Sequence, residues 1–159
     1  MNVDELIVLI RATTTRMELL VAQLSVAEIN QRGAVGVWSV KDVLAHIAFW
    51  ERYGATIVRD AMRGSTPDLV ADDETERNNA SVVAQYYQRS LAAVISDWQQ
   101  AREDLIEAIE DLEDEDLNDP DRFPWSEGRS LLDQIAGNSF DHEQEHIEQI
   151  RAWMLQVKS

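Results

Sequence analysis

The sequence predicts an all-α protein, a four-helix bundle with a long crossover connection between its second and third helices. Four long segments place apolar residues at alternating steps of three and four, which is the spacing of one helical face. Serine-led capping boxes precede helical segments, and no segment alternates as a half-buried strand does. At 159 residues, we expect a single domain spanning residues 1–159, with a core that needs no disulfide.

The first predicted helix covers residues 4–24, and Asp4 is placed to cap it. Its apolar positions form one narrow seam, which is typical of an amphipathic helix. The seam consists of Leu6, Ile10, Thr13, Met17, Leu20 and Leu24. Residues 25–36 carry a capping box led by Ser25 and two glycines, so we expect a turn that includes one helical turn.

The second predicted helix begins with a capping box at Ser39 and runs to about residue 62, where Gly64 ends it. Its apolar face consists of Val43, Leu44, Ile47, Trp50, Ile57, Val58 and Ala61. His46 lies at the edge of that face, one turn before Trp50.

Residues 63–80 form the longest stretch without a pattern. A connection of this length usually crosses over another element or covers a site. Helical periodicity returns from about residue 79 to residue 112, with Ser90 as a candidate break. The acidic run 110–116 predicts a fraying helix end, because acidic side chains disfavour a helix C-terminus.

The last predicted helix starts at a third capping box, at Ser130, and runs to about Gln156. Its seam consists of Leu131, Ile135, His142, His146, Ile150, Trp153 and Val157. Both histidines interrupt this apolar seam, so we expect both imidazoles to face the bundle interior. A buried polar atom without a hydrogen-bond partner lowers the free energy of unfolding by about 1–3 kcal/mol. Two inward-facing imidazoles on one seam therefore need one explanation that covers both.

The three histidines of the chain, His46, His142 and His146, predict a metal site. The pair on the last helix is four residues apart, which places both rings on one face. A third imidazole from the second helix would complete three neutral nitrogen ligands, with a further position open for water or substrate. The alternatives are histidines satisfied separately within the core, or histidines on the bundle rim that bind no metal.

The string His142-Glu143-x-x-His146 also matches a zinc metalloprotease motif. Such proteases place this helix beneath a sheet, whereas the sequence predicts no strand. We therefore disfavour a protease.

Composition limits the partners that we expect. Lys and Arg total 14 against 30 Asp and Glu, a formal charge of −16, which repels phosphates and anionic membrane surfaces. We therefore expect a small-molecule substrate, neutral or cationic, with no nucleic acid and no membrane as partner. The chain has no cysteine and no apolar stretch of membrane-spanning length, so we expect a soluble cytoplasmic protein.

Two elements, Trp38-Ser-x-x-Asp-x-x-x-His46 and His142-x-x-x-His146, resemble the DinB/YfiT-like superfamily of bacterial four-helix-bundle metalloenzymes in their residues, order and separation. The resemblance spans essentially the whole chain. In that family one histidine of the second helix and two of the fourth form a triad, and those positions match the three histidines of this sequence.

The resemblance implies a divalent metal, with Zn or Ni favoured over Fe or Mn. It also implies a metal-dependent transferase or related detoxification or stress-response enzyme that uses a low-molecular-weight thiol such as bacillithiol or mycothiol. Because the chain has no cysteine, that thiol would arrive as a cosubstrate. Relatives pair helices to form homodimers, which this chain's aromatic surplus would allow. The competing class is a non-catalytic protein that holds a metal or captures a small molecule.

Neighbourhood along the helices selects five further pocket candidates. They are Trp38, Trp50, Trp125, Asn138 and Glu145. Asn138 and Glu145 flank the histidines of the last helix, where either could orient a ring or a bound water. The three tryptophans lie in or before the histidine-bearing helices and could floor a pocket. Tryptophans at such positions also serve as core residues, and Glu145 could equally be a solvated acid. No catalytic residue is assigned.

Overall fold

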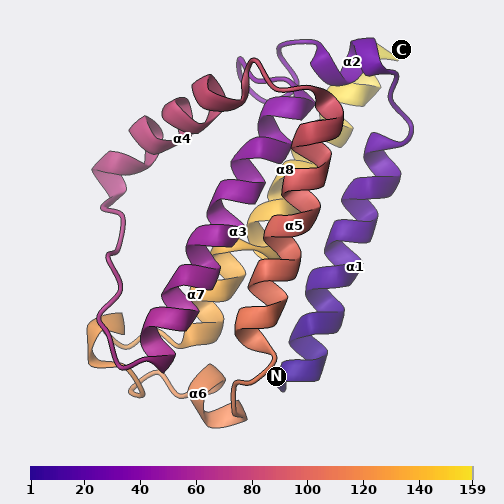
Figure 1. Cartoon of the computed structure of the whole chain (residues 1–159). Helices are drawn as coiled ribbons and strands as arrows, with labels where there is room; N and C mark the ends of the chain where they lie inside the picture. The colour runs from indigo at the N-terminus through magenta and orange to yellow at the C-terminus, as the bar shows by residue number, and fades with distance from the viewer. Residues whose placement is uncertain (159) are drawn as a thin grey trace.

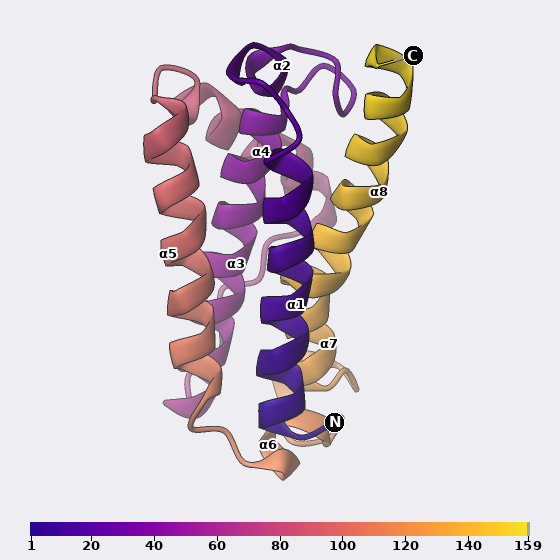
Figure 2. The same cartoon turned by 90° about the vertical axis from the view of Figure 1, so that its right-hand side faces the viewer.

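The computed structural model describes residues 1–158, and four columns of helix run side by side through it (Figures 1 and 2). The columns are α1 (Val3–Val21), α3 (Val40–Met62), α5 (Leu91–Ile109), and α7 (Leu131–Asn138) followed by α8 (Phe140–Val157). Shorter elements join them: α2 (Val26–Asn30), α4 (Asp72–Tyr86), α6 (Asp114–Asn118) and the 3₁₀ turn η1 (Pro124–Ser126). No strand occurs within residues 1–158, so the predicted all-α bundle is confirmed. No helix in this range combines the length and apolar character needed to cross a bilayer.

The helix starts follow the predicted capping boxes closely. Ser25, Ser39 and Ser130 each accept a hydrogen bond from the backbone N–H three residues on, and each box is reciprocated by an acidic side chain. The first helix differs, because its cap is Asn2 and not Asp4. Only Asn2 lies three residues before Glu5, so only Asn2 completes a box with that carboxylate.

The crossover connection contains a helix whose first half the sequence pattern does not reveal, since helical periodicity is detected only from about residue 79. Helix α4 begins at Asp72, inside the stretch 63–80 that we expected to be unpatterned. Val82 is the one buried residue of α4, so the helix has no apolar seam for periodicity to detect. In Figure 1 it leans outward beside α3. The predicted break at Ser90 is confirmed, since Ser90 caps α5.

Two predictions near the C-terminal half need correction. The acidic run 110–116 does not fray from one long helix; α5 ends at Ile109 and α6 starts at Asp114. The last helix is not continuous, because it breaks at Ser139, whose φ of −139° and ψ of −105° are not helical. No proline marks this break. Ser139 is fully buried and its hydroxyl donates to the carbonyl of Ile135, which keeps the broken backbone satisfied.

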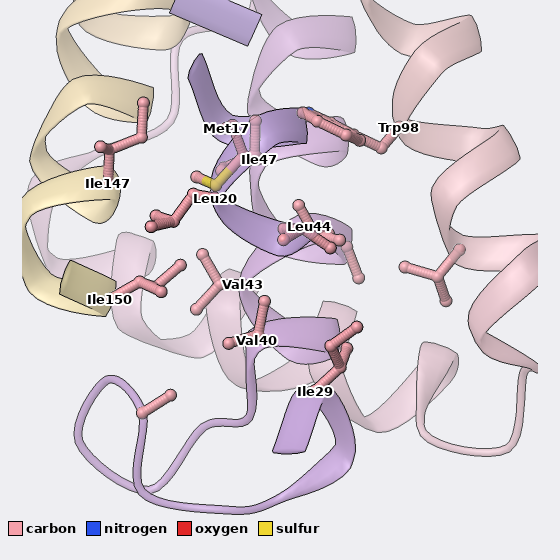
Figure 3. Close-up of a cluster of buried hydrophobic side chains, with 14 of the residues drawn as sticks. Met17, Leu20, Ile29, Val40, Val43, Leu44, Ile47, Trp98, Ile147 and Ile150 are labelled. Carbon is pink, nitrogen blue, oxygen red and sulfur yellow. The ribbon is translucent and has the colours of Figure 1, made fainter. Parts of the chain in front are cut away.

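The core consists of two apolar clusters separated by buried polar side chains. Figure 3 shows the first cluster, in which Met17, Leu44 and Ile150 converge from three helices. Along α1, Ile10 belongs to the second cluster and Met17 to the first, with a buried threonine between them. In each of the other columns a buried polar side chain likewise lies between residues of the first cluster and residues of the second. We call these buried residues the polar layer: Thr14, Glu51, Arg102 and Glu143.

Candidate metal centre

The three histidines reach one point from two columns of the bundle. His46 lies two turns into α3, and its side chain is buried between that helix and α8. His142 and His146 lie on the first turns of α8, immediately after the break at Ser139. The break at Ser139 therefore lies just before the histidine pair, within one helical turn of His142.

The ring nitrogens of the three histidines converge. His142 Nε2 lies 2.7 Å from His46 Nε2 and 3.0 Å from His146 Nε2. The three rings are 4.6–5.0 Å apart between centroids and meet edge to face. Nitrogens bound to one ion at about 2.0–2.1 Å lie roughly 3 Å from one another. The spacing of the three Nε2 atoms is therefore compatible with a shared ion.

The outer nitrogen of His146 faces a partner that orients its ring. His146 Nδ1 lies 2.8 Å from Gln149 Oε1, one turn along α8. Since an amide oxygen only accepts, this contact places a proton on Nδ1 and leaves the Nε2 lone pair directed at the cluster. The Nδ1 atoms of His46 and His142 are buried without a protein hydrogen-bond partner among residues 1–158.

All three histidines are held in their neutral form. Burial, together with the neighbouring His142 and His146, lowers the pKa of His46 to about 2. Burial and His146 lower the pKa of His142 to about 3. Burial also lowers the pKa of His146. Neutral imidazole is the form that binds a metal, so the three histidines can hold an ion.

A cavity of about 360 Å³ opens against the histidines, within the size range of small-molecule sites. It is lined by Trp38, His46, Trp50, Thr75, Asn79, Gly137, Asn138, His142, Glu145 and His146. Four of the five pocket candidates from the sequence are among these residues. Trp38 lies against the cluster, with its ring centroid 4.9 Å from that of His46.

Trp125 lies elsewhere, contrary to our expectation. It stacks on Phe123, with ring centroids 5.7 Å apart, and packs against the second apolar cluster. Its closeness in sequence to the last helix does not bring it to the histidines, because α7 intervenes. Trp125 is therefore a packing residue.

Helix α4 supplies two residues of the cavity that sequence reasoning missed, Thr75 and Asn79. Trp50 Nε1 donates a 2.8 Å hydrogen bond to Asn79 Oδ1, which ties α4 to α3 above the cavity. Nothing in the sequence marks these residues, since α4 lacks a seam. Gln149 was also missed, although its spacing three residues after His146 is a usable signal.

The buried acids were missed as well. Glu143 is 1% exposed and Glu51 is not exposed at all. Glu143 hydrogen-bonds to Thr14 inside the core and does not line the histidine cavity. It therefore does not occupy the position of a general base beside the histidines.

The fold and the site together define a helical bundle with three histidines gathered at a cavity wall. The family model described as the DinB superfamily matches residues 9–150, and the chain belongs to this superfamily. An uncharacterised protein from Escherichia coli UTI89 has a similar structure, with a TM-score of 0.79, 14% identity, and coverage of 99% of this chain and 95% of that one. The colibactin self-resistance protein ClbS, solved in complex with double-stranded DNA, has a TM-score of 0.77, 11% identity, and coverage of 95% and 94%. No curated protein sequence matches significantly.

This comparison corrects one prediction. Excluding nucleic acid as a partner was wrong, because a protein of this fold is seen in complex with double-stranded DNA. The exclusion rested on the formal charge of −16, which is summed over the whole chain. A net charge does not determine whether one face of a protein can meet a phosphate backbone.

Proposed function

We propose that this protein is a divalent-metal-dependent enzyme that acts on a small electrophilic molecule, with His46, His142 and His146 as the metal ligands. The observation that carries the proposal is the convergence of three neutral Nε2 atoms on the wall of a ligand-sized cavity. Three neutral nitrogen ligands suit Zn or Ni better than the oxygen-preferring Mn, and they also accept Fe.

The metal would supply Lewis acidity, which lowers the pKa of a bound thiol or water near neutral pH. The chain's own residues would do the rest. Gln149 holds the His146 ring in the binding tautomer, and Trp38 covers one side of the cluster. Asn138 and Glu145 line the cavity where a substrate would lie, and each offers a polar side chain to orient it. With no cysteine in the chain, a thiol nucleophile would come as a cosubstrate.

Metal analysis tests the first half of this proposal. Full-length protein purified without a histidine tag is expected to contain close to one divalent ion per chain. His142→Ala should lose most of it, whereas Glu148→Gln, an exposed change on the same helix, should keep it. A wild-type protein that takes up no Zn or Ni would refute the proposed site.

Turnover tests the second half. The zinc-loaded protein is mixed with a chlorodinitrobenzene, with and without a small thiol. The thiol would release its proton to solvent, its sulfur would bond to the ring carbon and chloride would leave. Absorbance of the thioether product follows the reaction. Loss of turnover in His46→Ala with retained folding supports the enzyme.

The second candidate function is capture of a small molecule without turnover. Two tryptophans on the walls of one cavity favour it, since aromatic faces bind flat apolar ligands. A self-resistance protein among the structural neighbours supports a protective role, and its DNA complex makes a double-stranded oligonucleotide part of the assay. Tight binding of the electrophile with no product would favour capture.

A homodimer also remains a proposal, supported by exposed Val8 and Leu19 on α1 and testable by light scattering.

A further inference from the structure

A second groove adjoins the histidine cavity. Its volume is about 410 Å³, and it lies between the loop residues 35–38 and the α4 residues Glu76, Asn79 and Ala80. Trp38 and Asn79 line both the groove and the histidine cavity. The two spaces therefore adjoin at Trp38 and Asn79.

The loop side of the groove is held by backbone hydrogen bonds within the loop. The backbone N–H groups of residues 33–35 all point at the carbonyl of Trp38, at 2.9–3.2 Å, and Trp38 N–H donates back to Val35 at 2.9 Å. Gly36 has a φ of 58°, a conformation that glycine adopts at little cost and that the tight turn requires. These bonds hold the backbone of Trp38, whose side chain lines both spaces.

The helix side of the groove is fixed by Asn79. Its side-chain oxygen accepts the indole N–H of Trp50, so the turn of α4 facing the groove is tied to α3. Both sides are thus held by hydrogen bonds of the protein itself. A preformed site loses less conformational entropy on binding than one that must first be ordered.

The chemistry changes from one space to the other. The groove presents Val35, Val37, Trp38 and Ala80, and Val37 is 66% exposed although it is a large apolar residue. Its one charged side chain is Glu76, and the charged side chain on the histidine cavity is Glu145. An apolar space next to a nitrogen-lined one suits an amphiphilic ligand, and the two acids disfavour an anion.

We propose that the groove binds a flat apolar arm of the substrate, packed against Trp38, while the reactive end of the same molecule lies at the three histidines. The substrate class is therefore an elongated, neutral or cationic molecule with an aromatic or alicyclic arm. This inference rests on the proposed function for the identity of the reactive end. The arm site itself depends only on residues 35–38 and α4.

The test compares imidazole with naphthylmethyl-imidazole as probes on zinc-loaded, full-length protein by calorimetry. Both carry the same metal-binding head, and only the second carries an arm. The arm is expected to tighten binding at least about tenfold. Ala80→Trp, which fills the groove at an exposed helical position, should abolish that gain and leave imidazole binding unchanged. Ala84→Trp, one turn along the same helix and outside the groove, is the matched control and should keep the gain.

A second measurement works without metal. Naphthylmethylammonium should quench the tryptophan fluorescence of the metal-free wild-type protein. Calorimetric titration of the two variants with the same cation should show weaker binding to Ala80→Trp than to Ala84→Trp. If imidazole fails to bind but this cation still binds in the groove, the proposed function fails and the arm site stands. If the arm adds no affinity to a bound imidazole, the arm site is refuted while the metal site stands. If the wild-type protein self-associates and Ala80→Trp abolishes that association, the inference would also be overturned. The groove would then be covered by a second copy of the chain.

Discussion

Thr14 of α1 hydrogen-bonds to Glu143 of α8, with Thr14 Oγ1 3.1 Å from Glu143 Oε2, inside the bundle core. The same hydroxyl lies 3.1 Å from the carbonyl of Ile10. The single hydroxyl proton of Thr14 is therefore shared between the Ile10 carbonyl and the Glu143 carboxyl group. Glu143 directly follows His142 on α8, so this contact also fixes the rotation of the helix that carries two histidines.

The protonation of Glu143 predicts a pH effect on stability. Burial raises its pKa from 4.5 to about 7, although the Thr14 contact and Arg102 act in the opposite direction. Between pH 4.5 and pH 7 the unfolded state releases this proton first, so the free energy of unfolding falls as pH rises, by about 1.4 kcal/mol per pH unit. Glu143→Gln, which mimics the protonated acid, should therefore gain stability relative to wild type from pH 5 to pH 8. Urea unfolding of the metal-free protein measures this, and the exposed change Glu148→Gln should show no such trend.

The two buried acids should be coupled. Burial raises the pKa of Glu51 well above its usual value, and the neighbouring Glu143 raises it further, against Arg102 and Arg52. At pH 8, replacing either acid by glutamine removes the electrostatic repulsion that opposes ionisation of the other acid. We expect the double variant Glu51→Gln, Glu143→Gln to gain less than the sum of the single gains, by about 1 kcal/mol. Strict additivity in a double-mutant cycle would contradict a shared electrostatic layer.

The histidines predict a pH effect of the opposite sign. The folded-state pKa values of His46 and His142, about 2 and about 3, lie below the 6.5 of an unperturbed histidine. In metal-free protein the unfolded state therefore binds more protons below pH 6.5, and stability falls as pH falls, by about 1.4 kcal/mol per pH unit for each histidine. His46→Phe should flatten this slope between pH 6.5 and pH 4.5. An unchanged slope would mean that His46 is not held neutral by burial.

Helix α3 approaches α7 closely at Gly54. A Cβ at Gly54 would lie 3.2 Å from Asn138 Cβ and 3.7 Å from Leu105 Cδ1. Gly54→Ala gains about 1 kcal/mol of helix propensity, which offsets the tight contact, so its stability should stay near that of wild type. Gly54→Val should lose about 1–3 kcal/mol by overpacking and displace Asn138 from the cavity. Thermal unfolding of both variants checks this, and a Val variant as stable as wild type would refute the close approach.

Much of the fold could be predicted because its signals are local. Capping boxes at Ser25, Ser39 and Ser130 and the apolar seams reproduce the helix columns. The seam also places the histidine pair inward, which spacing alone does not. The start of α4, residues 72–78, escaped prediction because this helix buries almost no apolar surface, and the place of Asn79 on the cavity wall was missed as well.

Other features depend on three-dimensional context. Glu51 and Glu143 resemble the many solvated acids of this chain, and only packing of four helices shows that both are buried. No proline marks the break of the last helix at Ser139. The buried Ser139 hydroxyl donates to the Ile135 carbonyl there, a contact that only the three-dimensional structure shows. Trp125 was misplaced because closeness in sequence to a helix does not determine which end of the bundle a loop covers.

Gln149 should control metal affinity without touching the metal. Its amide oxygen, 2.8 Å from His146 Nδ1, fixes the tautomer and angle of that ring. Gln149→Leu keeps similar bulk but removes the acceptor, so we expect zinc affinity to fall about 10- to 100-fold, the usual effect of losing such a partner. Competition with a chelator measures the affinity, and the absorption spectrum of the cobalt-substituted protein reports ring geometry directly. The control is Gln144→Leu, whose amide donates to Glu148 on the same helix and should leave affinity and spectrum unchanged. Equal affinities for Gln149→Leu and wild type would show that the His146 ring is held by packing alone.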